Sequence, residues 1–179
     1  LPAPAIDANG APDTAGYDWV AIGAAADIVQ SDFGKDPANY LPGQIAQALA
    51  EWAPTQVSRY KFQPYVSIAS LNAQAGAAPS EVSFADAIKP LGQLALSGPL
   101  SVTAGSSVTL QLDNPLKVSD YNFDPTTLTY RFTFEDQGQQ HSVMVNTAAS
   151  LAQRLGVLLP QHLRGVVITG LSGDVLPLA

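Results

Sequence analysis

Cysteine is absent from the 179 residues of this chain. Its absence excludes disulfides, thiolate nucleophiles and thiolate metal ligands, so the stability of the fold must come from packing. Only two histidines are present, His141 and His162, which is little material for a site of several imidazoles or a Ser-His-Asp triad. We therefore expect no metal ion and no cofactor.

Basic residues are also scarce. Eight Lys and Arg stand against fifteen Asp and Glu, which gives a formal net charge of −7. A protein that neutralises nucleic-acid phosphates needs clustered Lys and Arg, and here these residues are scattered along the chain. We exclude nucleic acid as a partner, and we expect no transmembrane segment.

The length and the apolar content indicate a folded chain of one domain, or of two small ones. Hydrophobic residues make up 46% of the sequence and charged residues 13%, which is enough apolar material for a core. Few Lys and Glu, with much Ala, Gln, Ser and Thr, favour an exported bacterial protein, either extracellular or at the cell surface. No secretory leader pattern opens the chain, so either a signal was removed or a longer polypeptide precedes Leu1.

The first part of the chain alternates between helical and extended patterns. Apolar spacing predicts helices at 17–26 and 42–60, and short apolar runs predict strands at 28–33 and 61–70. Pro54 should kink the second helix or end its first part, and Pro64 should place its strand near an edge or at a strand start. This alternation predicts a parallel sheet of βαβ units.

After Ser70 the pattern changes to β. A loop rich in Gly, Ala, Pro and Ser runs to residue 80, and a brief helix capped by Ser83 follows. Strands are predicted at 100–102, 107–112, 128–134 and 141–145, and a last helix and strand at 147–155 and 163–171. The predicted organisation is an α/β portion over residues 1–93, a β-rich insertion over 94–146, and the last helix and strand over 147–179.

Four stretches carry a more specific signal through their order. They are 17–27 (YDWVAIGAAAD), 43–70 with its strand KFQPYVSIAS, 132–149 (FTFEDQGQQHSVMVNTAA) and 164–174 (RGVVITGLSGD). In this order they resemble the C-terminal half of a glycoside hydrolase family 18 barrel, a chitinase-like family that includes spore-germination peptidoglycan hydrolases. The corresponding family patterns are "YDY-x-A-L-G-x-A-A-D", "P-x-x-K-I-x-L-G-L-P-x-Y-G", "Y-x-D-x-x-G-x-x-H-x-V-W-F-x-D-A" and "GGVMIWSLDGDD".

The resemblance implies a (β/α)₈ TIM barrel with its site at the carboxyl ends of the strands. This chain would hold only the last strands, so the expected fold class is α/β, a partial barrel with an inserted antiparallel β subdomain. The family's catalytic motif, Asp-x-x-Asp-x-Asp-x-Glu on strand four, is absent here. The three glutamates, Glu51, Glu81 and Glu135, have no acidic neighbours at that spacing, so we assign no catalytic residue.

The resemblance also implies where a substrate would lie. Asp32 is a loose counterpart of the family's substrate-contacting Asp on strand six, and Thr169 stands in place of the Trp that floors the sugar site. Ala69 replaces a Tyr of strand seven, so two aromatic platforms are missing. An Asp at a strand end is also commonly a loop cap. The candidate substrate-binding residues are Gln30, Asp32, Phe33, Thr169 and Asp174.

Two motifs in the β-rich part leave alternatives open. Asp120-x-Asn122-x-Asp124 has the spacing of a calcium loop but lacks the Gly and Glu of such a loop, so a turn is favoured over an ion site. The aromatic residues Tyr121, Phe123 and Tyr130 form either a ligand strip or the core of a small sheet, and we expect core packing.

These observations favour a secreted or cell-surface, family-18-like protein without catalytic machinery in this chain. Its expected partners are polysaccharide or peptidoglycan, and another polypeptide segment that completes the barrel and covers the open sheet edge. One alternative is part of an active glycosidase whose catalytic Glu lies on a preceding segment or another chain. The other is an extracellular structural or assembly subunit that uses the β-rich insertion as an interaction surface.

Overall fold

The computed structural model describes residues 1–2, 4–6, 12–97, 109–113 and 116–171. These residues form two compact units. The first contains residues 1–69, 124–129 and 146–171, and the second contains residues 70–123 and 130–145. The second unit is thus inserted in the sequence of the first. It begins at Ser70, ahead of residue 94, where the sequence pattern starts the β-rich insertion.

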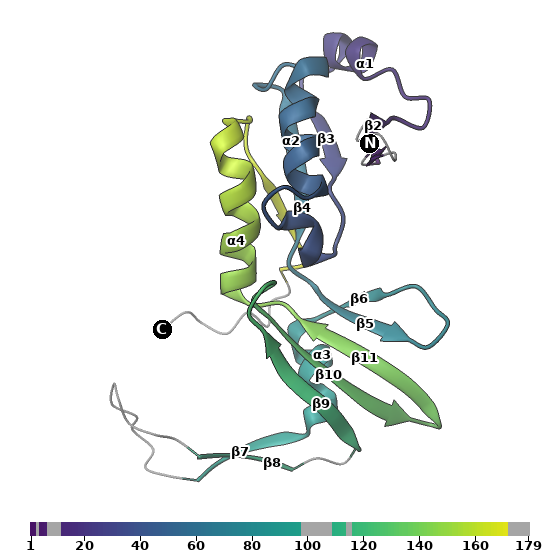
Figure 1. Cartoon of the computed structure of the whole chain (residues 1–179), viewed down its shortest axis with the longest axis vertical. Helices are drawn as coiled ribbons and strands as arrows, with labels where there is room; N and C mark the ends of the chain where they lie inside the picture. The colour runs from purple at the N-terminus through teal and green to yellow at the C-terminus, as the bar shows by residue number, and fades with distance from the viewer. Residues whose placement is uncertain (3, 7–11, 98–108, 114–115, 172–179) are drawn as a thin grey trace. The chain divides into compact units, whose positions relative to one another are not determined.

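A parallel sheet of three strands organises the first unit (Figure 1). Its strands are β3 (Val29–Asp32), β4 (Phe62–Ser67) and β12 (Val167–Thr169), in the order β12-β4-β3. Gln30 pairs with Gln63, and Thr169 with Ser67. Pro2 adds a parallel bridge to Asp32 on the other side of β3. The predicted parallel sheet of βαβ units is therefore present, and the mixed α/β class is confirmed.

Helices follow or precede each of these strands. The cap of α1 is Asp18, whose side chain accepts from the N–H of Ala21 at 2.9 Å, and α4 begins with a reciprocal cap between Thr147 and Ser150. Such caps satisfy the first N–H groups of a helix and mark its start. The helical segments are α1 (Trp19–Ala25), η1 (Pro37–Tyr40), α2 (Ile45–Gln56), α4 (Ala148–Leu158) and η3 (Leu159–Gln161), beside a short pair, β1 (Ala5–Ile6) with β2 (Pro12–Asp13).

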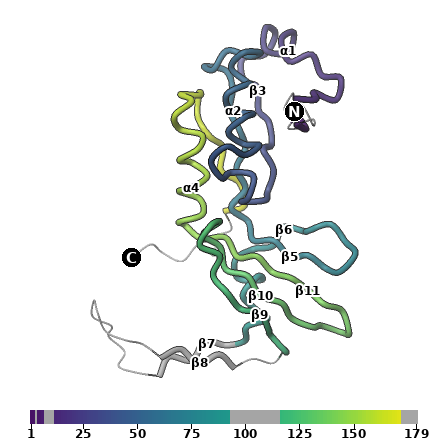
Figure 2. Tube along the Cα trace, viewed as in Figure 1, coloured from purple at the N-terminus to yellow at the C-terminus, as the bar shows by residue number. Residues whose placement is uncertain are grey.

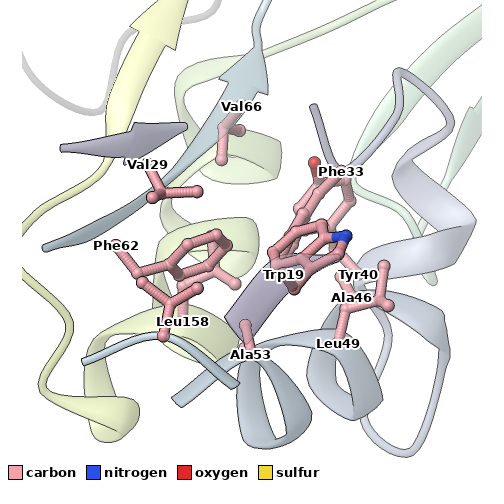
Figure 3. Close-up of a cluster of buried hydrophobic side chains, with 12 residues drawn as sticks. Trp19, Val29, Phe33, Tyr40, Ala46, Leu49, Ala53, Phe62, Val66 and Leu158 are labelled. Atoms are coloured by element: carbon pink, nitrogen blue, oxygen red, sulfur yellow. The ribbon is translucent and has the colours of Figure 1, made fainter. Parts of the chain in front are cut away.

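The core of the first unit lies between one face of this sheet and the helices (Figure 3). Phe62 is fully buried, and its ring lies 5.8 Å from that of Trp19 and 5.9 Å from that of Phe33. Alternate residues of a strand point to opposite faces, so the residues between these apolar ones point away from the helices. The buried cluster comprises Trp19, Val29, Phe33, Tyr40, Ala46, Leu49, Ala50, Ala53, Val57, Phe62, Val66 and Leu158.

Helix α1 packs closely through a small residue. A Cβ added to the buried Gly23 would lie 2.9 Å from Cγ2 of Val57, closer than real Cβ contacts come. A glycine at this position therefore lets α1 approach the end of α2. Helix α2 continues past Pro54 to Gln56, so of the two predicted effects of Pro54, a kink or an end of the helix, the end is wrong. Pro54 stands in the last turn, where its missing N–H removes a single helical hydrogen bond.

Pro64 is the third residue of β4, which is the central strand, so the expectation of an edge strand is wrong, whereas a place near the strand start is what the structure has. The carbonyl of Tyr65 accepts from the N–H of Phe33 and so turns toward β3. Successive residues of a strand turn their backbone groups to opposite sides, so Pro64 turns toward β12. Pairing with β12 begins only at Tyr65, opposite Val167. Pro64 therefore lies just before the first residue of β4 that pairs with β12, and ahead of β12 the N–H of Arg164 donates to the carbonyl of Phe62 at 3.2 Å.

A five-stranded antiparallel sheet with the order β6-β5-β11-β10-β9 forms most of the second unit, and Figure 2 shows the path of the chain through it. The short helix α3 (Phe84–Ile88) packs against β5 and β11, and Ser83 caps it as predicted, accepting from the N–H of Asp86. The strands are β5 (Ser70–Gln74), β6 (Ser80–Val82), β9 (Val118–Asp124), β10 (Thr129–Asp136) and β11 (Gln139–Val145). Next to them stand η2 (Lys89–Leu91) and the pair β7 (Gln93–Ser97) with β8 (Thr109–Asp113).

Two predictions for this unit are wrong. The segment after Ser70, predicted as a loop, contains β5 and β6, because β5 is paired on both sides, with β6 and with β11. The acidic segment from Asp120 to Asp124, predicted as a turn, belongs to strand β9, in which Asp120 has a φ of 55°. The predicted strands at 128–134 and 141–145 are present as β10 and β11, and the prediction at 100–102 lies outside the described residues.

Candidate functional site

A hydrogen-bonded set of polar side chains lies on the face of the parallel sheet that points away from the helices. The hydroxyl of Tyr65 donates to Oε1 of Gln30 at 2.6 Å, and Nε2 of Gln30 donates to Oε1 of Gln63 at 3.0 Å. The register explains this set, because Gln30 pairs with Gln63 and Tyr65 follows two residues later on the same face. All three side chains are partly buried. We call these three residues the polar face.

The predicted site residues fall in different places. Asp32 pairs with Tyr65, is exposed, and accepts from the N–H of Gly34 at 2.8 Å, which closes a turn at the end of β3. Val167 pairs with Tyr65, and Thr169 follows Val167 by two residues, so the side chain of Thr169 lies on the same face of the sheet as the polar face. The strands thus bring Gln30, Asp32 and Thr169 to one face of the sheet.

The remaining two predicted residues are not brought to that face. Phe33 is 2% exposed and packs against Phe62 in the core, on the side of the helices. Asp174 lies outside the described residues. The family patterns do not mark Gln63 or Tyr65, which sequence reasoning therefore missed. Period-two alternation along KFQPYVSIAS is the signal that would have found them, because it separates both side chains from Phe62 and Val66.

A buried cationic cluster supports the carboxyl end of β4. Arg154 of α4 is 1% exposed, its Nη1 donates to the carbonyl of Ser67, and its Nη2 donates to Oδ1 of Asn146 at 2.6 Å. Nδ2 of Asn146 in turn donates to the carbonyl of Ala69 at 2.5 Å. The two side chains donate to the carbonyls of Ser67, the last residue of β4, and of Ala69, two residues beyond it. They hold the strand end next to the polar face in place.

Burial also governs the electrostatics of this cluster. The guanidinium of Arg154 lies 5.3 Å from the ring centre of Tyr40, whose hydroxyl donates to the carbonyl of Gly34 at 3.0 Å. Burial raises the pKa of Tyr40 well above its usual range, and the charge of Arg154 opposes this rise. Burial lowers the pKa of Arg154 itself. A neutral phenol next to a buried guanidinium is therefore the stable state of this cluster.

We expect the free energy of unfolding to fall as the pH rises above 10. In the unfolded chain Tyr40 ionises near the usual value of about 10, whereas in the folded chain its raised pKa keeps it protonated. Its contribution is present below pH 10 and is lost as the pH rises toward the folded pKa, at about 1.4 kcal/mol per pH unit. Urea unfolding at pH 9 and pH 11 measures the loss, and Tyr40→Phe should show a smaller one. An equal loss in both proteins would contradict the assignment.

The polar face carries amide and hydroxyl groups but no pair of carboxyls for acid–base work. Glu51 lies on α2 and accepts from Nε2 of Gln47, while Glu81 and Glu135 belong to the second unit.

Among the residues that the structure describes, no group of three His, Asp or Glu could hold a metal ion. In that same part of the chain, no helix is long and apolar enough to cross a membrane. The polar face can donate and accept hydrogen bonds to an uncharged, hydroxyl-rich ligand.

Core packing was predicted for Tyr121, Phe123 and Tyr130 of the second unit, but these three residues are exposed. Tyr121 is 55% exposed, Phe123 45% and Tyr130 38%. The core of this unit instead gathers next to α3, around Phe132 and Val143. The expectation of core packing is wrong because α3 is only five residues long and packs against β5 and β11.

No protein-family model and no curated protein matches the sequence. The structure is similar to that of a chitinase from Chromobacterium violaceum, with a TM-score of 0.59, 18% identity, and coverage of 96% of this chain and 49% of that one. It is also similar to the putative sporulation-specific glycosylase ydhD from Bacillus subtilis, with a TM-score of 0.57, 16% identity, and coverage of 94% and 52%. The chain thus spans about half the length of these proteins. The predicted resemblance is confirmed for the fold, which is like that of glycoside hydrolase family 18.

Proposed function

We propose that this chain is the C-terminal portion of a family-18-like barrel and that its polar face binds carbohydrate. The observation that carries the proposal is the hydrogen-bonded set of Gln30, Gln63 and Tyr65 on the face of a parallel sheet away from the helices. In a closed (β/α)₈ barrel this face points inward, and ligands bind at the carboxyl ends of the strands. The face of the three strands that points away from the helices would form one wall of such a site.

The proposed ligand is a neutral polysaccharide built from N-acetylglucosamine, such as chitin or the glycan of peptidoglycan. Its hydroxyl and amide groups match the donors and acceptors of the polar face. We include Asp32 and Thr169 as neighbours on the same face of the sheet. Phe33 is left out because its side chain is in the core. Asp174 remains a prediction from the family resemblance.

The proposed role is binding without turnover by this chain, outside the cell or at its surface. The full sequence lacks the family's Asp-x-x-Asp-x-Asp-x-Glu motif, so no general acid is assigned to it. In the described part of the chain, β12 pairs on one side only, with β4. We propose that another polypeptide segment pairs with the sheet and completes the barrel, because open edges are normally covered.

The second candidate function is that this chain forms part of an active glycosidase. The catalytic Glu would then lie on that other segment. One observation favours it: the chain spans 49% of the chitinase that it resembles. Release of reducing ends from chitin by this chain alone would contradict both candidates. Release only after addition of a polypeptide that carries Asp-x-Glu would favour the second.

Titration of the full chain with a soluble N-acetylglucosamine hexamer tests the proposed site. We expect Tyr65→Phe to weaken binding roughly tenfold, because loss of the hydroxyl frees the amide of Gln30, and one such hydrogen bond corresponds to about 1.4 kcal/mol. Calorimetry measures the dissociation constant. The matched control is Tyr60→Phe, at a tyrosine of the same unit that is 68% exposed, and it should bind like the wild type. Equal affinities of all three proteins would contradict the proposal.

A further inference from the structure

Three exposed aromatic rings meet on two neighbouring strands of the second unit. The rings of Tyr121 and Tyr130 are stacked, with centres 5.8 Å apart and planes at 20°, and the centre of Phe123 lies 5.0 Å from that of Tyr130. Tyr121 and Phe123 come from β9, and Tyr130 from β10. We call these three residues the aromatic strip. They come together across a strand pair, so the strip exists only in the folded unit.

The aromatic strip continues the apolar face of the five-stranded sheet beyond the core that lies next to α3. Tyr130, Phe132 and Phe134 alternate along β10 and share one face, but only the last two are buried. The ring of Tyr121 lies 6.3 Å from that of Phe132, which joins the strip to the core. Groups of exposed apolar side chains on a stable protein commonly mark a binding surface.

The strip is a firm platform because side chains also join the two strands. The hydroxyls of Ser119 and Thr133 lie 2.8 Å apart, and the hydroxyl of Thr133 donates to Oδ2 of Asp120 at 2.9 Å. Two of these groups stand directly before Tyr121 in β9. The backbone of two paired strands is already ordered before a ligand binds. Stacking on their rings therefore costs little conformational entropy of the protein.

The size and chemistry of the strip decide what it can bind. A stable protein interface takes about 20–30 residues from each partner, far more than three rings. Flat, exposed rings with two hydroxyls instead match the flat C–H faces and hydroxyl rims of pyranose sugars. We infer that the aromatic strip is a second carbohydrate site, which binds a linear, neutral polysaccharide by stacking of its sugar rings. This inference rests on the proposed function, since it takes the same ligand class.

Binding of the full chain to the N-acetylglucosamine hexamer and to insoluble chitin tests the inference. The double variant Tyr121→Leu with Phe123→Leu keeps apolar surface but removes two planar faces. We expect it to weaken binding to chitin by roughly tenfold or more, because two stacking contacts are lost. Tyr60→Ala removes an exposed tyrosine of the first unit and serves as the control.

Each outcome decides between the two sites. If Tyr65→Phe weakens binding and the leucine variant does not, the second site is overturned and the proposed function stands. If the leucine variant alone weakens binding, the strip is the site and the polar face is not. Absence of binding in the wild type overturns both. Near-ultraviolet circular dichroism of the leucine variant verifies that the sheet still folds, because both substituted residues are exposed and their replacement should not unfold it.

Discussion

Asn146→Ala is expected to lower the free energy of unfolding of the first unit by about 3 kcal/mol. Its side chain donates to the carbonyl of Ala69 and accepts from Nη2 of Arg154, and both partners are buried. Alanine leaves a buried carbonyl and part of a buried guanidinium without hydrogen bonds. The Nε of Arg154 already lacks a partner in the structure, so the cluster has no spare acceptor. Urea unfolding followed by tryptophan fluorescence measures the change.

Tryptophan fluorescence reports on this unit alone, because both tryptophans of the chain, Trp19 and Trp52, belong to it. Measuring Asn146→Ala in a second variant that lacks the charge separates the role of the charge from that of packing. In Arg154→Met the guanidinium is gone, and Asn146→Ala should then cost less than in the wild type. Equal costs in the two backgrounds would show that Asn146 does not act through Arg154.

Phe62→Ala is expected to destabilise the first unit by about 4 kcal/mol, the larger of the two effects. The ring of Phe62 is fully buried between those of Trp19 and Phe33, so alanine leaves a cavity in the centre of the core. Thermal and urea unfolding measure the loss. A change below about 1 kcal/mol would contradict the placement of β4, because an exposed residue at this position would give that value.

Two further variants keep this prediction testable if Phe62→Ala does not fold. Phe62→Leu retains most of the apolar volume and should cost about 1.5 kcal/mol or less. Tyr60→Ala removes a similar ring two residues earlier, where the side chain is 68% exposed and lies beside Arg59, and should cost below about 1 kcal/mol. The order of the three losses tests whether Phe62 is buried and Tyr60 is exposed.

Local signals were sufficient for the elements of the first unit. Apolar spacing and short apolar runs predicted α1, α2, α4 and the three parallel strands, and the order of four stretches predicted the family-like fold. The expectations that Pro54 ends its helix and that Pro64 marks an edge strand failed for different reasons. Pro54 stands in the last turn of α2, where only one helical hydrogen bond is lost, and Pro64 lies one residue before pairing with β12 begins.

The candidate site was predicted only in part. Gln30, Asp32 and Thr169 were expected from family positions, and the strands bring them to one face. Gln63 and Tyr65 were missed because no family pattern marks them and their alternation was not followed. Phe33 was misjudged because one residue of shift along a strand moves a side chain to the opposite face.

By itself, the sequence determined which chemistry this protein has. It has no thiols, few imidazoles, no clustered basic residues and no family-18 acid motif, and its periodicity determined the kinds of elements it forms. Only the tertiary structure decided which side chains meet. The contact of Tyr65 with Gln30 depends on the register between β3 and β4, and the exposure of Tyr121, Phe123 and Tyr130 depends on how far a short helix reaches over its sheet. Such distances between segments remote in sequence follow from packing, which no local pattern encodes.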